Sequence, residues 1–224
     1  MKHFTDQAIV LSRTDFGEAD RIIIFLTRQH GKVRGLARGV RKQKSKLAGG
    51  IELFSTSEIS FLIGRGEVST IISTRLIKHF GNIVKNLDRT NAAYDFLKQL
   101  NKQTEDQAEE AYFDLLKSAL HALDEQTDLE LIKLWFKAQL LRLSGSAPNL
   151  QTDKSGNKLS TDSKYNFNFE AMSFAQAVAQ EKSFSANDIK FLRLLFGTAQ
   201  PAVIQKINGF EKLLQNCAPI LNHL

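Results

Sequence analysis

The sequence predicts an α+β protein, with a small β-barrel in residues 1–80 and an α-helical domain in residues 81–224. Up to about residue 80, short runs rich in valine, isoleucine and phenylalanine alternate with glycine-containing or charged turns, which is typical of strands. Beyond that point, leucines and aromatic residues recur at i, i+3, i+4 and i+7, which is the period of a helix. An irregular, cysteine-free insert is expected at about residues 146–170.

Five short strands are predicted in the N-terminal part: Gln7–Arg13, Arg21–Arg28, Gly31–Ala37, Glu52–Ile63 and Val68–Lys78. Asp15–Asp20 supplies the first turn around Gly17, residues 29–31 supply the second, and the Gly-Arg-Gly run at 64–66 is a tight hairpin turn. Five strands with turns at this spacing favour a five-stranded OB-fold barrel.

The helical part is expected to contain three long helices and several shorter elements. The long helices are predicted at Asn82–Asn101, Asp106–Asp124 and Asp128–Leu143. After them come a loop or small irregular module over Pro148–Asn168, a short helix over Phe169–Glu181, a helix opened by Ser185 with Asp188 as a partial capping box, and a last helix over Ile204–Leu221.

Composition limits the class of protein. Hydrophobic residues make up 42% and charged residues 24% of the 224 residues, as in globular proteins. Cys217 is the one cysteine, so an intrachain disulfide and a cysteine-based zinc site are excluded, which favours a reducing, cytoplasmic location. The first residues become polar too early for a signal peptide, and no apolar run approaches the roughly 18 residues of a membrane span.

A cluster of positive charge is the most informative local feature. Residues 28–46, called here the basic segment, hold eight basic residues and no acidic one, although the whole chain has a net charge of +6. Its members are Arg28, Lys32, Arg34, Arg38, Arg41, Lys42, Lys44 and Lys46. Concentrated charge of this kind indicates a site for phosphates, and the alternative is a solvated charge run. The stretch Arg41–Lys46 has no apolar residue and is expected to form a mobile loop that contacts phosphates without reading bases.

Aromatic residues bear on whether bases are also contacted. The basic segment contains no phenylalanine, tyrosine or tryptophan, and strand alternation predicts that Phe25, Phe54 and Phe61 belong to the core. Phe16, in the first turn, is the better exposed candidate for stacking. The sequence therefore predicts binding dominated by the nucleic-acid backbone, with weak base preference.

No enzyme is predicted. Asp15, Glu18 and Asp20 could serve as metal-binding carboxylates of a nuclease, but aspartates are also common in turns for their hydrogen bonds. A phosphate-binding P-loop is missing from the sequence, and the five histidines have no metal-ligand spacing. An OB-fold RNA-binding module remains the other alternative. We expect neither a metal nor another cofactor.

The order of these motifs and the residues within them resemble those of the RecO family of bacterial DNA repair and recombination mediators. The N-terminal likeness runs through AIVLSRTDFGEADRIIIFLTRQHGKVRGLARGVRKQKSKLAGGIELF and the Gly-Arg-Gly hairpin, and the C-terminal likeness through WFKAQLLRLSGSAPNL. The resemblance implies an OB-fold followed by a helical domain. It also implies DNA contacts at Arg34, Arg38, Arg41, Lys42, Lys44 and Lys46, and we add Arg28, Lys32 and Arg65 to that expected interface.

The same resemblance implies partners. Family members bind single- and double-stranded DNA, anneal complementary strands without ATP and, with the protein RecR, help load recombinase onto strands coated by single-stranded-DNA-binding protein. The acidic tail of that coating protein docks on the family's helical domain, for which we name Lys133, Lys137 and Arg142 as anchors. Many members carry a four-cysteine zinc module after the motif that here contains Pro148, whereas residues 149–168 of this chain contain no cysteine.

Overall fold

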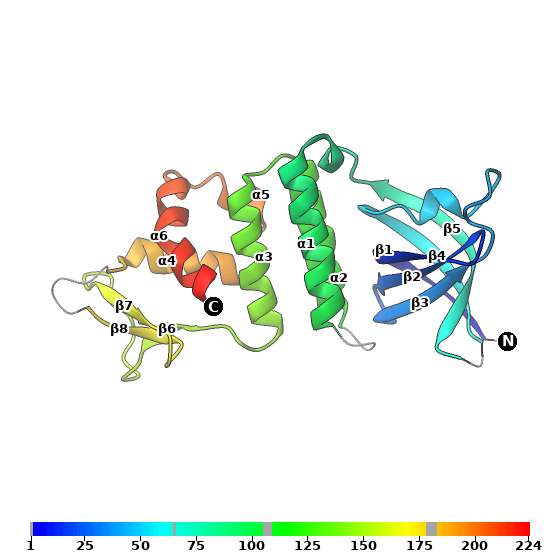
Figure 1. Cartoon of the computed structure of the whole chain (residues 1–224). Helices are drawn as coiled ribbons and strands as arrows, with labels where there is room; N and C mark the ends of the chain where they lie inside the picture. Colours follow the sequence, from blue (N-terminus) through cyan, green and yellow to red (C-terminus); the bar gives the residue numbers. More distant parts are fainter. Residues whose placement is uncertain (1, 65, 105–108, 178–182) are drawn as a thin grey trace. The chain divides into compact units, whose positions relative to one another are not determined.

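The computed structural model describes residues 2–64, 66–104, 109–177 and 183–224, and the chain forms two compact units, residues 1–125 and 126–224 (Figure 1). The first unit contains a barrel and two long helices, and the second contains further helices with a small sheet. The predicted division at residue 80 falls inside the first unit, between its barrel and its helices, and stays a prediction about folding domains. None of the described helices is both long and apolar enough to cross a membrane.

The barrel has five strands: β1 (His3–Phe16), β2 (Asp20–Thr27), β3 (Lys32–Ala37), β4 (Ser55–Leu62) and β5 (Val68–His79). They close in the order β1-β2-β3-β5-β4, with β3 and β5 parallel and the other neighbours antiparallel. This is the predicted OB-fold barrel, and its first two turns are confirmed at Gly17 and Gly31, which both have positive φ. The predicted fourth strand begins three residues too early, because Phe54 adopts φ 55°, which interrupts extended backbone before Ser55.

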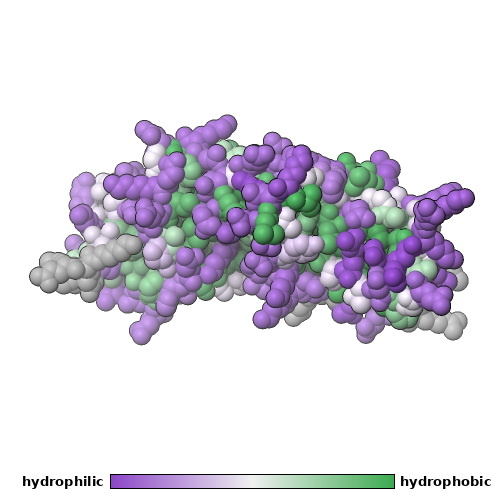
Figure 2. All heavy atoms as spheres, turned by 45° about the horizontal axis from the view of Figure 1, so that its top comes forward, coloured by the Kyte–Doolittle hydropathy of each residue, from purple (hydrophilic) through white to green (hydrophobic). Residues whose placement is uncertain are grey.

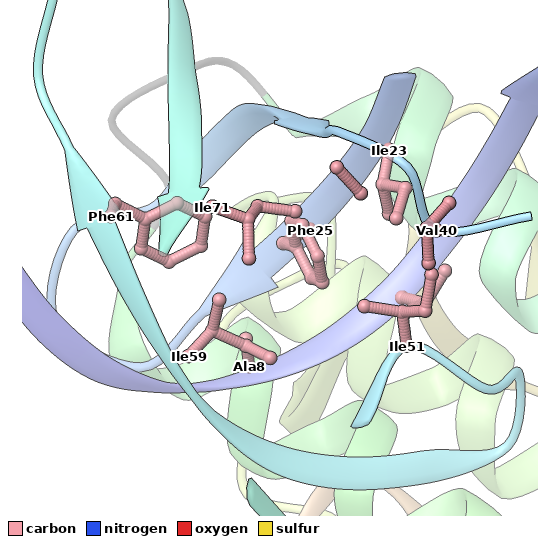
Figure 3. Packing of buried hydrophobic residues seen from close by; sticks show 10 residues of the cluster. Ala8, Ile23, Phe25, Val40, Ile51, Ile59, Phe61 and Ile71 are labelled. Atoms are coloured by element: carbon pink, nitrogen blue, oxygen red, sulfur yellow. The ribbon is translucent and has the colours of Figure 1, made fainter. Parts of the chain in front are cut away.

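Alternating apolar side chains of the strands fill the barrel. Figure 3 shows this core running from Phe61 at one end to Val40 and Ile51 at the other, with Phe25 and Ile71 between them. Val40 and Ile51 belong to the long connection between β3 and β4, so that connection is anchored in the core at both of its ends. Phe25 and Phe61 are fully buried, as the strand alternation predicted, and Phe54 is 3% exposed.

Two helices complete the first unit. The 3-10 turn η2 (Ile83–Lys85) leads into α1 (Leu87–Gln103), and α2 (Glu110–Asp124) lies beside α1 and also contacts β1 and β2 (Figure 1). Asn86 caps α1 by accepting a hydrogen bond from the backbone N–H of Arg89, as an N-cap asparagine does. The second predicted helix is found from Glu110 onward, and its proposed start at Asp106 lies outside the described residues.

In the second unit, α3 (Leu129–Leu143) packs with α4 (Ala186–Phe196), α5 (Pro201–Ile204) and α6 (Phe210–His223). The predicted capping box is present: Ser185 and Asp188 each bond the other's backbone N–H at the start of α4. The prediction of a single last helix over Ile204–Leu221 is wrong. The chain there forms two helices, because α5 ends at Ile204 and Gly209, just before α6, takes a left-handed conformation with φ 74° that a continuous helix does not contain.

A three-stranded sheet replaces two other predictions. Its strands β6 (Asn149–Asp153), β8 (Ser173–Gln176) and β7 (Tyr165–Asn168) occur in that order across the sheet. The stretch Pro148–Asn168 is thus non-helical, as expected, but it also contains strands. The helix predicted at Phe169–Glu181 is wrong over its described residues, because β8 pairs with both neighbouring strands although its composition favours a helix. The buried ring of Phe174 contacts the rings of Tyr165, Phe167 and Phe184, so aromatic packing holds this module together.

Candidate nucleic-acid interface

The basic segment divides into side chains that face solvent and side chains bound within the fold. Four of its members are exposed and, within the described part of the chain, have no ion-pair partner: Arg38, Lys42, Lys44 and Lys46. All four lie in the connection that leaves the end of β3, which we call the basic loop and define as residues 38–46. In the space-filling view this end of the barrel carries hydrophilic side chains that extend into solvent (Figure 2).

Backbone contacts give the basic loop a defined base. At its start, the N–H of Gly39 donates to the Asp20 carboxylate over 2.7 Å and the N–H of Arg41 donates to the Ala19 carbonyl over 2.9 Å. After it, the Leu47 carbonyl accepts a hydrogen bond from the Thr74 hydroxyl over 3.1 Å. Between these anchors the loop makes turns through bonds from Lys42 to Gly39 and from Ser45 to Lys42. Its cations therefore project from a fixed base, where phosphates can approach them.

Arg41 connects this loop to the β1–β2 turn. Its Nε lies 3.6 Å from a carboxylate oxygen of Asp15, and its Nη1 donates to the Gly17 carbonyl over 3.5 Å. The hydrogen bond from Arg21 to Asp15, helped by the charge of Arg41, lowers the pKa of Asp15 despite some desolvation. Phe16 in this turn is 53% exposed, so the one aromatic residue predicted to be available for stacking lies beside the basic loop.

The carboxylates of the β1–β2 turn do not assemble a metal site. Asp15 pairs with two arginines and Asp20 accepts a backbone hydrogen bond from the basic loop. No group of three or more potential metal-ligating side chains gathers anywhere in the described ranges. The roles that these carboxylates have in the structure are those of turn residues.

Three cations of the basic segment are bound within the first unit. Arg28 forms an ion pair of 2.7 Å with Glu110 of α2, and this hydrogen bond raises the pKa of Arg28. Lys32 donates to the carbonyls of Asn101 and Thr104 over 2.9 and 2.6 Å, where it stabilises the C-terminal end of α1. Arg34 pairs with the exposed Glu67 over 3.2 Å. DNA contacts by Arg28 and Lys32 stay a prediction, and Arg65 lies outside the described residues.

The strands bring together a second feature that the sequence did not reveal. A pocket of about 410 Å³ lies at the end of the barrel where β1, β3 and β5 begin, whereas the basic loop leaves β3 at its opposite end. Phe4, His30 and Arg34 line it, together with Lys2 and Glu67. The sequence held only a weak signal for this pocket. Phe4 continues the alternating pattern of β1 towards the N-terminus, before Gln7, where that strand was expected to begin.

The anchors proposed on the helical domain all lie on α3, and each contacts a neighbouring group. Lys133 pairs with Glu130 of the same helix over 2.7 Å, and Arg142 donates to Gln139 over 2.9 Å. Lys137 donates to the Asn222 carbonyl near the end of α6 over 3.4 Å. Each cation therefore has a neighbour within the second unit, and partner docking by these residues stays a prediction.

Comparison with known proteins gives one consistent result. Residues 1–80 match the family described as Recombination protein O N terminal, and residues 92–218 match Recombination protein O C terminal. A protein named DNA repair protein RecO from Dehalococcoides mccartyi is 38% identical over 149 residues, which is 66% of this chain and 58% of that relative. Relatives of the same name from Halalkalibacterium halodurans and Myxococcus xanthus are 28% identical over 196 residues (85% of this chain, 76% of the relative) and 32% identical over 155 residues (68% and 63%).

Proposed function

This chain belongs to the recombination protein O family, and from that premise we propose that it is a non-enzymatic DNA-repair protein that binds DNA and anneals complementary strands. The matched region spans 58% of the length of the Dehalococcoides mccartyi relative, and the activity of the whole protein is part of the proposal. We include in it the loading of recombinase onto single strands, with RecR and the tail of single-stranded-DNA-binding protein as partners.

The basic loop is the observation that carries this proposal. Four exposed cations project from anchored backbone, and none of them has an acidic partner in the described ranges. Lysine and arginine contact phosphates regardless of base sequence, so such a loop binds any strand. Annealing requires that two strands, both negatively charged, approach each other, and a cationic loop lowers their repulsion while base pairing tests the sequence.

A strand-annealing assay tests the proposal directly. Two complementary oligonucleotides, one carrying a fluorophore and the other a quencher, are mixed with the wild-type protein with and without magnesium. We expect the protein to increase the annealing rate in both conditions and to leave both strands intact. Strand cleavage that depends on magnesium would support the nuclease alternative, and tight RNA binding without annealing would support the RNA-binding alternative.

Two variants connect the activity with the loop. Replacing Arg38, Lys42, Lys44 and Lys46 by alanine should abolish most of the acceleration. A matched variant removes the same charge from exposed helical lysines: Lys98, Lys102, Lys117 and Lys212. If the matched variant loses as much activity as the loop variant, net charge rather than the loop accounts for annealing. Repeating the assay on strands coated with single-stranded-DNA-binding protein tests the partner part of the proposal.

A further inference from the structure

We propose that the pocket at the opposite end of the barrel from the basic loop binds an unpaired nucleobase of a DNA strand, stacked on His30, with Lys2 and Arg34 contacting the flanking phosphates. This inference rests on the proposed function, because it assigns a base contact to a protein proposed to bind DNA. It differs from the basic loop in chemistry, since the loop is proposed to contact only the DNA backbone and has no aromatic residue.

The pocket has the dimensions and lining of a ligand site. Its volume of about 410 Å³ falls in the range of roughly 300–1,000 Å³ that small-molecule pockets occupy. Its walls combine apolar side chains, which include Phe4, Val33 and Ile63, with the charged side chains of Lys2 and Arg34. A nucleotide has the matching parts, which are a flat base and a negatively charged phosphate.

A column of three stacked rings leads from the barrel core to this pocket. Phe61 is fully buried, and its ring centroid lies 5.0 Å from that of Phe4 with an interplanar angle of 25°. The Phe4 ring in turn lies 4.1 Å from the His30 ring at 27°. His30 is the solvent-accessible member, with 42% of its side chain exposed. A base that stacks on His30 would extend the column by one ring.

The His30 ring is held in place before any ligand arrives. Its Nδ1–H donates to Asp6 over 2.8 Å, and the Asp6 side chain is only 4% exposed. The same Asp6 oxygen accepts a hydrogen bond from the N–H of Gln29 over 2.9 Å, and the N–H of His30 donates to the Thr27 hydroxyl over 3.1 Å. A ring fixed in this way loses little conformational freedom when a base stacks on it, which favours binding.

The charges around the pocket suit a phosphate backbone. Lys2 is exposed and is in no ion pair within the described residues. Arg34 is paired with Glu67, but that carboxylate is 86% exposed, and exposed pairs of this kind are weak enough for a phosphate to displace them. Lys32 also lines the pocket, but its ammonium group is bound to α1, so we do not include it as a phosphate contact.

Stacking on His30 requires a base whose face is free. In duplex DNA both faces of each base are covered by neighbouring base pairs, so the pocket distinguishes single strands and strand ends from continuous duplex. Lys32, Val33 and Arg34 of β3 line the pocket, and the four residue steps from Arg34 to Arg38, where the basic loop begins, extend about 13 Å at roughly 3.3 Å per residue. One single strand of a few nucleotides can therefore reach both features, within the roughly 4–16 nucleotides that an OB-fold covers.

A matched pair of substitutions separates the ring from its hydrogen bond. His30→Ala and His30→Phe both remove the hydrogen bond to Asp6, but His30→Phe keeps an aromatic ring at this position. The probe is a short single-stranded oligonucleotide that contains 2-aminopurine, whose fluorescence is quenched when it stacks. His121→Ala, an exposed histidine of α2, serves as the control.

We expect His30→Ala to weaken single-strand binding about 5- to 150-fold, which corresponds to one stacked base, and to lose the protein-induced quenching. His30→Phe should restore most of both, and His121→Ala should match the wild type. Duplex affinity should be unchanged in all three. The inference is overturned if His30→Ala binds and quenches like the wild type while alanine substitutions in the basic loop still abolish binding, or if His30→Phe is as weak as His30→Ala. If the wild type binds no DNA, the proposed function fails, and this inference with it.

Discussion

Replacing the four exposed cations of the basic loop should change how DNA affinity depends on salt. If Arg38, Lys42, Lys44 and Lys46 each neutralise one phosphate, they account for a slope of about −3.6 in a plot of log K against log salt on duplex DNA. A fourfold rise in salt then weakens their share of the binding about 150-fold, and about 50-fold on single strands, where the slope is about −2.8. The alanine variant at all four positions should have a slope flatter by these amounts.

The assay is fluorescence anisotropy of labelled single-stranded and duplex DNA of two unrelated sequences, at salt concentrations from about 50 to about 200 mM. The affinity loss should be the same for both sequences, because phosphate contacts carry no base information. The control removes Lys98, Lys102, Lys117 and Lys212 and should keep the wild-type slope. An unchanged slope in the loop variant, with the fold intact by circular dichroism, would refute the assignment of phosphate contacts to this loop.

Three further predictions concern the contacts that hold the fold. Lys32→Ala should lower the free energy of unfolding, measured by urea titration, by about 1–3 kcal/mol, because the carbonyls of Asn101 and Thr104 lose a charged donor. The control Lys42→Ala should change this free energy by less than about 0.5 kcal/mol. Gly50→Ala should lower the melting temperature, because the added Cβ would overlap the Thr74 Cβ and overpacking costs about 1–3 kcal/mol. Gly49→Ala, whose Cβ would meet nothing within 4 Å, should not lower it, and equal melting temperatures of the two variants would contradict this packing. Burial alone would raise the pKa of Asp188, but hydrogen bonds from Ser185 and Asn216 outweigh the effect of burial and lower this pKa. The stability that the ionised carboxylate contributes should therefore be present at neutral pH and be lost as the pH falls below about 4. The difference in unfolding free energy between wild type and Asp188→Asn should therefore shrink on acidification, and a difference independent of pH would show that the charge of Asp188 does not contribute.

The barrel and the basic loop could be predicted from the sequence because local signals determine them. Alternating apolar residues gave the strands, and Gly17 and Gly31 gave the turns, since each strand carries its own pattern and each turn its own glycine. The Arg41–Lys46 part of the loop was recognisable because charge without apolar residues is a local property of composition. The capping box of Ser185 and Asp188 was likewise readable within four residues.

Tertiary structure decided which side chains are available and which residues share a site. Arg28 and Lys32 belong to the same charged segment as Lys42, but helices α1 and α2 bring partners to them from about 70 or more positions along the chain. The same closure of the barrel places Phe4, His30 and Phe61 in one column, although they come from three separate segments. Pairing with β6 and β7 likewise made a strand of residues 173–176, whose composition favours a helix. Composition and periodicity describe neighbours along the chain, whereas these contacts exist only once distant strands and helices have packed, and for that reason the sequence could predict the basic loop but not the stacked rings.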